Sequence, residues 1–440
     1  MNRHRIITDP HGPGPNAGSN RRRSRIQLAA AVAALLALLA TACGGDDDSD
    51  SAATDGGGGA SGEITVWAMG AEGEQLGEFA EEFMAENPDI TVNVDPLAWD
   101  VAHERLITAI AGDEAPDVSQ MGTTWMGEFA SIGALAEVPD DVDMDAYFEG
   151  ARDTAIVDEV AYGVPWYVET RLLYYRTDLA EQAGITEPPG DWDELRAMAE
   201  AMQQQAGSEW GIYLQPGQTG AWQTFMPFFW QRGGDILADD SEFALDSPEM
   251  VEAVEFYQSF YDDGLSPSSV PEGFDITPAF VQGTHPMFFS GPWHMSLIED
   301  LGGADIEGRW AVAPMPQEES GTSFVGGSDL VVFEGSDNSE AAWEFVRWLS
   351  TPEVQGRWYE AVSALPAVES AWQEGELASD DNLAIFGDQL SDAIHPPAIS
   401  TWEQIATEID GELERVAAGE ASPEDAAQAM QESASSIGVG

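Results

Sequence analysis

The chain has 440 residues, of which 43% are hydrophobic, so it can bury a core larger than that of a typical single domain. Acidic residues number 80 against 16 basic ones, and the sequence has no lysine. A surface this negative repels phosphate backbones and anionic headgroups, which argues against a nucleic-acid partner and favours an uncharged or cationic ligand. The carboxylates are spread along the whole length, which indicates adaptation to concentrated salt; an ordinary acidic exported protein is the alternative.

The first 43 residues have the pattern of an export signal. Four arginines between residues 21 and 25 precede an apolar run from Leu28 to Ala40 that ends in small residues. The run is too short to cross a bilayer comfortably, so a permanent transmembrane helix is the weaker interpretation. The segment Leu38 to Cys43 resembles the lipobox of bacterial lipoproteins, although Ala40 stands where that motif usually has leucine. The resemblance implies a mature chain that begins at Cys43, the only cysteine, with a lipid anchoring it to the outer face of the cell membrane.

Residues 44–61 form a run of Gly, Asp, Ser and Ala that cannot bury enough apolar surface to fold, so we expect a disordered tether. The first strand is expected at Ile64–Trp67 and the second at Ile90–Val94. Between them, a helix that ends at Asn87 carries its apolar residues on one face: Leu76, Phe79, Ala80, Phe83 and Met84.

The same alternation of strands and helices recurs further along the chain. Three helix starts are marked by capping residues: Asp191 with Glu194, Ser247 followed by Pro248, and Ser422 followed by Pro423. The apolar segments Trp310–Val312 and Leu330–Phe333 suit buried strands. No internal repeat occurs at solenoid spacing, and the pattern predicts an α/β fold.

Several short motifs follow one another in a specific order and spacing. They are Ala115-Pro116-Asp117-Val118, Thr123-Thr124-Trp125, the run Gly163 to Arg171, the run Tyr174 to Leu179, Ser290-Gly291-Pro292-Trp293, Gly326-Gly327-Ser328, and the helix Ala341 to Leu349 with Thr351-Pro352-Glu353 after it. In this order they resemble the type 1 extracellular solute-binding proteins of ABC sugar importers, the superfamily that includes maltose-binding protein. The resemblance extends from about Glu63 to the C-terminus.

The resemblance implies a two-lobed, type II periplasmic-binding-protein-like fold with a hinge and a ligand cleft between the lobes. It places one lobe at residues 62–170 plus 314–360 and the other at 171–313 plus 361–440. The implied function is capture of a di- or oligosaccharide and delivery to the transmembrane subunits of an ABC permease, without a cofactor and without catalysis. We expect a monomer.

Sugars present hydroxyl groups and flat C–H faces, so a sugar site needs aromatic platforms beside carboxylates and backbone groups. The chain has 15 tryptophans, and several stand in segments expected to be loops. Transfer from the family, residue by residue, gives these ligand-binding residues: Thr124, Trp125, Glu169, Trp222, Trp293, Gly327, Ser328 and Trp402. Trp293 ranks highest because Gly291-Pro292-Trp293 resembles the family segment whose tryptophan stacks on a sugar ring. Core packing is the alternative for each tryptophan.

Thr124, Trp125 and Arg171 leave the identity of the ligand undecided. Thr124 and Trp125 stand where related maltose-binding proteins carry an acidic and a basic residue, which weakens the case for maltose itself. Arg171 could reach the ligand, and an ion pair with a nearby carboxylate is equally compatible with the sequence.

Other chemistries have weaker support. The histidines after the signal lack the spacing of a metal motif, no Gly-x-Ser-x-Gly elbow occurs, and a chain without lysine cannot have a phosphate-binding Gly-x-x-x-x-Gly-Lys loop. A secreted glycoside hydrolase would also combine aromatic platforms with carboxylates, and a binding protein for a non-sugar solute is a further alternative. The lipobox, the acidic tether and the ordered motifs favour a binding protein over a hydrolase.

Overall fold

The structure is a computed structural model, and it describes residues 60–440 except 240, 241, 272, 374 and 376. The predicted export signal, the lipidation site Cys43 and residues 44–59 of the predicted tether lie outside the described residues. Among the described residues, no helix combines the length and the apolar character needed to cross a membrane.

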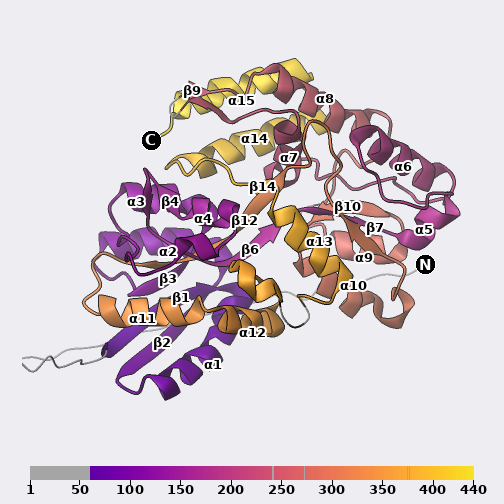
Figure 1. The fold of residues 1–440 in the computed structure, drawn as a ribbon. Coiled ribbons are helices and arrows are strands. Elements are labelled where there is room, and N and C mark those ends of the chain that lie inside the picture. Colours follow the sequence, from indigo (N-terminus) through magenta and orange to yellow (C-terminus); the bar gives the residue numbers. More distant parts are fainter. Residues whose placement is uncertain (1–59, 240–241, 272, 374, 376) are drawn as a thin grey trace, which may run out of the picture. The chain divides into compact units, whose positions relative to one another are not determined.

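A seven-stranded sheet organises one part of the molecule (Figure 1). Its strands are β1 (Gly62–Met69), β2 (Ile90–Leu97), β3 (Val118–Gly122), β6 (Val164–Thr170), β12 (Ser323–Val332), β13 (Leu365–Pro366) and β14 (Ala393–Ile394). The order is β13-β6-β12-β3-β1-β2, with β14 paired to β12. Strand β1 is parallel to β2 and β3, whereas β12 is antiparallel to β3 and β6.

Helices cover both faces of this sheet because its strands are apolar on both sides. Ile64, Val66 and Ala68 of β1 pack in one core with α1 (Gly70–Glu86), α11 (Ser339–Leu349) and α12 (Pro352–Val362). Trp67 and Met69 point to the other face and pack with α2 (Trp99–Ala111) and α3 (Met126–Ser131). Short elements complete this region: the 3-10 helices η1 (Thr123–Trp125), η2 (Met144–Ala146) and η4 (Glu369–Gln373), the helix α4 (Glu149–Thr154), and the strands β4 (Ile156–Val157) and β5 (Val160–Ala161).

A smaller antiparallel sheet has β7 (Leu172–Tyr175) between β10 (Met287–Ser290) and β11 (Ala311–Ala313). One face packs in a core with α5 (Thr177–Gln182), α6 (Trp192–Gln204), α7 (Trp222–Gln231), α8 (Pro248–Asp262), α14 (Trp402–Ala417) and α15 (Pro423–Ile437). The other face meets α9 (Ile276–Gln282), α10 (Trp293–Gly302) and α13 (Asp381–Leu390). The remaining elements are β8 (Leu237–Asp239), β9 (Glu242–Phe243) and the 3-10 helix η3 (Gly303–Asp305).

Local signals in the sequence explain where several elements begin. The predicted first strand, helix and second strand are confirmed as β1, α1 and β2, and the predicted Asn87 is the C-cap of α1. Asp191, Ser247 and Ser422 each accept a backbone N–H hydrogen bond at the start of α6, α8 and α15. Such caps satisfy donors that the first helical turn leaves without partners.

One residue joins the two sheets directly. β6 ends at Thr170 and β7 begins at Leu172, so Arg171 is the whole connection between them. The chain runs from the small sheet back to the large one between β11 and β12. The side chain of Arg171 therefore starts at the boundary between the two parts of the fold.

Candidate functional site

The parallel strands β1, β2 and β3 end at the same edge of the large sheet, and the segments that follow them carry aromatic and acidic side chains. Glu72 lies in the first turn of α1 after β1, Trp99 begins α2 after β2, and Thr124 and Trp125 lie in η1 after β3. Ligands of α/β folds commonly bind at the carboxyl ends of parallel strands. We therefore expect a ligand-binding site at this edge of the sheet.

Trp125 takes part in an aromatic cluster at this edge. Its ring contacts Trp99 edge-to-face with centroids 5.7 Å apart, and it contacts His103 at 5.1 Å. His103 Nε2 lies 2.8 Å from a Glu128 carboxylate oxygen. Trp99 is 38% exposed, while Thr124 and Trp125 are half-buried, so part of the cluster remains open to solvent.

A chain of polar side chains, mostly buried, links β3, β6 and β12. Gln120 donates to the hydroxyls of Tyr167 and Ser328 at 3.3 and 3.2 Å, and Ser328 donates to the Tyr167 hydroxyl at 3.1 Å. Gly327 has φ +130°, and a Cβ there would lie 2.1 Å from the Tyr167 carbonyl oxygen, so the close approach of β6 requires glycine. Of the predicted residues, Ser328 is fully buried and Gly327 is half-buried.

Two carboxyl groups in this region, those of Glu72 and Glu169, interact through their charges. Burial raises the pKa of Glu72, its backbone hydrogen bond opposes the rise, and the charge of Glu169 adds to it. Glu169 lies on β6, two residues after Tyr167, and its side chain is 20% exposed. Glu72 and Glu169 therefore supply hydrogen-bond acceptors within the range of each other's charge.

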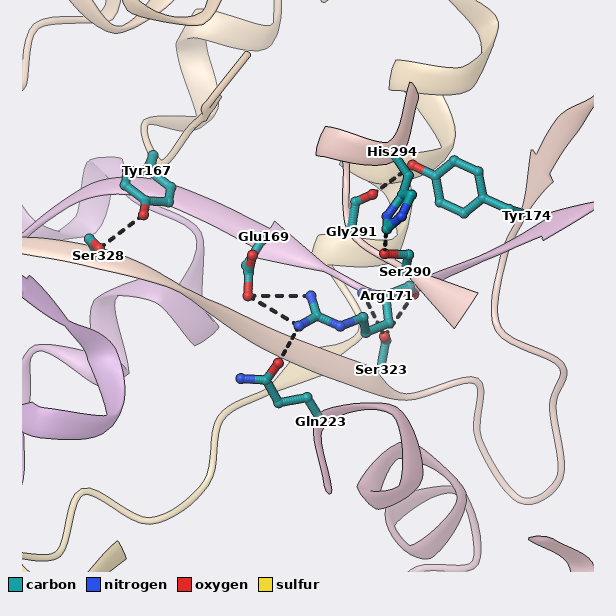
Figure 2. A network of polar contacts seen from close by, with 10 residues as sticks. All are labelled: Tyr167, Glu169, Arg171, Tyr174, Gln223, Ser290, Gly291, His294, Ser323 and Ser328. Carbon is teal, nitrogen blue, oxygen red and sulfur yellow. Dashed lines mark hydrogen bonds and ion pairs between the residues drawn. The ribbon is translucent and has the colours of Figure 1, made fainter. Parts of the chain in front are cut away.

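Arg171 connects Glu169 to groups from the other part of the fold (Figure 2). Its Nη1 and Nη2 both lie 3.3 Å from Glu169 Oε1, and Nη2 donates to Gln223 Oε1 at 2.6 Å. The guanidinium carbon is 5.0 Å from the ring centroids of both Trp293 and Phe324. Arg171 is only 4% exposed, so its charge is neutralised inside the protein rather than by water.

Trp293 is the first residue of α10 and is 36% exposed. A Cβ at Gly291 would lie 2.0 Å from the Trp293 ring, so only glycine allows the ring to fold back over the preceding turn. The Tyr174 hydroxyl donates to the Gly291 carbonyl at 2.6 Å, and Ser290 Oγ hydrogen-bonds His294 Nδ1 at 2.6 Å (Figure 2). Burial lowers the pKa of His294 to about 4, which leaves it neutral at physiological pH. These contacts fix the turn that carries Trp293.

Trp222 and Trp402 are in a different environment. They begin α7 and α14 and are 5% and 1% exposed. Their rings meet edge-to-face at 5.1 Å, and Trp222 also packs on Phe324 at 5.3 Å. Asp410 of α14 accepts the backbone N–H groups of Gly220 and Trp222 at 2.7 and 2.8 Å. This cluster supports the start of α7, whose next residue, Gln223, holds Arg171.

The structure therefore brings Glu169, Trp293 and Gln223 together around Arg171, with Gly327 and Ser328 on the strand paired to Glu169. Gly122, the residue before η1, pairs with Ser328, which brings Thr124 and Trp125 toward the same strand pair. A partly exposed indole beside carboxylate and amide groups can bind the C–H face and the hydroxyls of a neutral polar ligand. Within residues 60–440, outside the undescribed positions, no group of three or more His, Cys, Asp or Glu side chains could hold a metal ion.

Sequence reasoning did not select Glu72, Trp99 or Gln223. Glu72 and Trp99 had a usable signal, because each comes directly after a parallel strand. Gln223 had none, because it is 52 residues from Arg171 and only the folded chain brings the two together.

A cavity of about 1040 Å³ lies elsewhere, against α12 and the segment after it. Its lining includes Glu86, Trp348 and Arg357 and none of the predicted ligand-binding residues. The Trp348 indole N–H donates to Glu86, and the Arg357 guanidinium lies 5.9 Å from the Trp348 ring. The cavity and the candidate site are therefore different parts of the molecule.

The two sheets with their helices and the polar junction between them define a two-lobed α/β binding protein of the maltose-binding-protein type. The chain matches the family model described as bacterial extracellular solute-binding protein over residues 68–356, and it belongs to this family. Proteins of this family are extracytoplasmic binding proteins.

Three relatives illustrate the match. A protein of Brucella abortus (strain 2308) that is named only as a binding protein is 30% identical over 359 residues, which cover 80% of this chain and 87% of the relative. The maltotriose-binding protein of Pyrococcus abyssi (strain GE5 / Orsay) is 25% identical, with coverage of 81% and 78%. The structure of the sugar-binding protein MalE from the phytopathogen Xanthomonas citri is 33% identical with a TM-score of 0.81, covering 86% of this chain and 97% of that one.

Proposed function

We propose that this chain is the substrate-binding lipoprotein of an ABC sugar importer, which binds a di- or oligosaccharide outside the cell and delivers it to the permease. The observation that carries the proposal is the partly exposed Trp293. Its indole lies against the Arg171 guanidinium, which also pairs with the carboxylate of Glu169. An indole face and a carboxylate suit the two surfaces of a sugar, its C–H face and its hydroxyls.

Similarity supports sugar as the ligand class. The Pyrococcus relative is named for maltotriose and the Xanthomonas structure for sugar binding, and both match most of this chain. The acidic surface agrees with a neutral ligand, because a ligand that carried negative charge would be repelled.

In the proposed mechanism, the lobes are residues 62–170 plus 314–360 and residues 171–313 plus 361–440, and they close over the sugar. Trp125 and Thr124 would contact it from one lobe, and Trp222, Trp293 and Trp402 from the other. Glu169, Gly327 and Ser328 would supply hydrogen bonds, and Glu72 joins them on the basis of its position after β1. Because Trp222 and Trp402 are buried in this structure, their part would be to support the site or to meet a ligand after local rearrangement.

The membrane attachment is a further part of the proposal. Acylation of Cys43 would hold the protein at the outer membrane face, with residues 44–61 as a tether long enough to let the lobes reach the permease. Replacing Cys43→Ala should shift the protein from the membrane fraction to the medium. Equal membrane association of the variant would contradict the anchor.

We also propose adaptation to high salt. Arg171 between β6 and β7, Arg196 of α6 and Arg357 of α12 already pair with carboxylates, and the remaining acidic residues are in large excess. Lower ionic strength lengthens the screening distance and strengthens repulsion in the folded state. The melting temperature should therefore fall from molar to millimolar salt. A melting temperature that stays the same or rises would contradict the proposal.

Isothermal titration with maltose, maltotriose, diacetylchitobiose and galactobiose tests the ligand class. We expect saturable binding of one or more of these sugars with a stoichiometry of about one, and a raised melting temperature, because a ligand that binds only the folded state stabilises it by mass action. The same incubations are assayed for shorter sugars. Hydrolysis at a rate that depends on protein concentration would favour a glycoside hydrolase, and no binding across the panel would favour a non-sugar solute.

A further inference from the structure

The guanidinium of Arg171 is a deeply buried charge at the candidate site. It is 4% exposed, and its Nη1 is buried without a hydrogen-bond partner, although it lies 3.3 Å from Glu169 Oε1. A buried charge is costly unless it is paired, so the contacts that hold it are expected to be strongly constrained. Because so little of the side chain faces solvent, Arg171 influences a bound ligand mainly through its neighbours.

Those neighbours come from both parts of the fold. Glu169 is on β6 and Phe324 on β12, both strands of the large sheet. Gln223 is the second residue of α7 and Trp293 is the first residue of α10. Both helices pack beside the small sheet. Figure 2 shows the guanidinium between Glu169 and Gln223. Arg171 therefore joins the two lobes at the residue where the chain passes from one sheet to the other.

Each contact restricts one group of the candidate site. The cation lies 5.0 Å from the Trp293 centroid, within the range of a cation–π interaction, and the indole is further confined by Gly291. The bond from Arg171 to Gln223 orients the planar fork that also holds the Glu169 carboxylate. An indole and a carboxylate held in advance lose less conformational freedom when they bind a ligand.

We infer that Arg171 is a positioning residue, which sets the geometry of Trp293 on one lobe and of Glu169 on the other through a single buried guanidinium. This inference rests on the proposed function, because the sugar is the ligand that Trp293 and Glu169 would bind. Arg171 determines affinity by pre-organising these two groups rather than by contacting the sugar.

The first experiment needs no ligand. The protein is labelled with 5-fluorotryptophan, and the ¹⁹F resonance that disappears in Trp293→Phe is assigned to Trp293. Arg171→Met removes the charge at similar length, so this resonance should shift or broaden. The matched control is Arg196→Met, which removes an arginine that also lies over an aromatic ring, 5.6 Å from the Phe260 centroid, and pairs with Asp263. The control should leave the Trp293 resonance in place.

The second experiment measures affinity for whichever of the four panel sugars binds the wild type. Arg171→Met should weaken binding roughly 10-fold or more, given the strength of a desolvated cation–π contact. Arg171→Lys keeps a cation beside the rings and loses the planar fork, so it should fold and lose about 3-fold. Arg196→Met should bind as the wild type does.

A double variant separates positioning from a purely structural role. If Arg171 acts largely through Trp293, adding Arg171→Met to Trp293→Ala should cost less than about 3-fold beyond Trp293→Ala alone. An unchanged ¹⁹F resonance in Arg171→Met and Arg171→Lys, or wild-type affinity in both, would overturn the inference. Fully additive losses would overturn it too. If the wild type binds no panel sugar, the proposed function fails, while the ligand-free resonance still tests whether Arg171 positions Trp293.

Discussion

Trp293 and Trp402 occupy the same place in their elements and differ in almost everything else. Each is the first residue of a helix, α10 and α14, and so is Trp222 in α7. Trp293 is 36% exposed, whereas Trp402 is 1% exposed. The difference comes from partners far away in sequence: Trp402 packs on Trp222, and Trp293 lies beside a buried arginine.

The difference in burial indicates different roles for these tryptophans, one in stability and one in ligand binding. The Trp222–Trp402 pair is part of a core that holds the start of α7, so it contributes chiefly to stability. Trp293 is 36% exposed, so its side chain is accessible to a ligand, as the proposed function requires. A tryptophan at the beginning of a helix is compatible with either role, and its neighbours in the fold decide between them.

The largest expected effect on stability comes from Trp402→Ala. Removing a buried tryptophan leaves a cavity, so the free energy of unfolding should fall by about 3 to 5 kcal/mol. Urea denaturation followed by circular dichroism measures the change, with Trp293→Ala as the matched control. A loss below about 1 kcal/mol for Trp402→Ala would show that Trp402 does not act as a core residue and does not differ from Trp293 in this respect.

The next prediction concerns Trp293→Ala, which removes a rigid aromatic contact that the structure leaves partly exposed. Sugar affinity should fall by about 2 kcal/mol, or roughly 30-fold, while the denaturation midpoint changes less than in Trp402→Ala. Calorimetry and denaturation of the same preparation test both parts. A strongly lowered midpoint with nearly unchanged affinity in the folded fraction would assign Trp293 to the core instead.

Burial also distinguishes one carboxyl group, that of Asp329, from the exposed carboxylates of the surface. Asp329 follows Ser328 on β12, is 1% exposed, and accepts hydrogen bonds from the Thr154 hydroxyl, which lies 3.4 Å from each carboxyl oxygen. Burial raises the pKa of Asp329 from 3.8 to about 8. The folded state therefore holds a proton that the unfolded chain has released, so the stability that Asp329 contributes is present below pH 4 and is lost as pH rises through about 8.

Asp329→Asn should remove this pH dependence, which amounts to at most about 1.4 kcal/mol per pH unit for one proton. Unfolding free energies of wild type and variant are compared between pH 5 and 8, and their difference isolates Asp329 from the other carboxylates. Asp337→Asn, which removes an exposed carboxylate, serves as the control. Equal slopes for wild type and Asp329→Asn would show that Asp329 titrates as an ordinary surface group.

Much of the fold could be predicted from local sequence, because caps and periodicity act over a few residues. Ser247 caps α8 and Asn87 ends α1 as predicted. The candidate site was less accessible to prediction. Family motifs indicated Glu169 and Trp293, but the link between them depends on Arg171 and Gln223, which are 52 positions apart in sequence. Burial of Trp402 likewise depends on Trp222, a partner from another helix, and no local pattern encodes it.

We expect the sugar to bind against Trp293, and titration of the fluorotryptophan-labelled protein measures this contact. The panel sugar that gives a calorimetric signal is added stepwise while the ¹⁹F resonance of Trp293 is followed. We expect this resonance to move in a saturable way, with the dissociation constant that calorimetry gives. A Trp293 resonance that stays still while the same sugar binds with full occupancy would show that the sugar binds elsewhere on the protein.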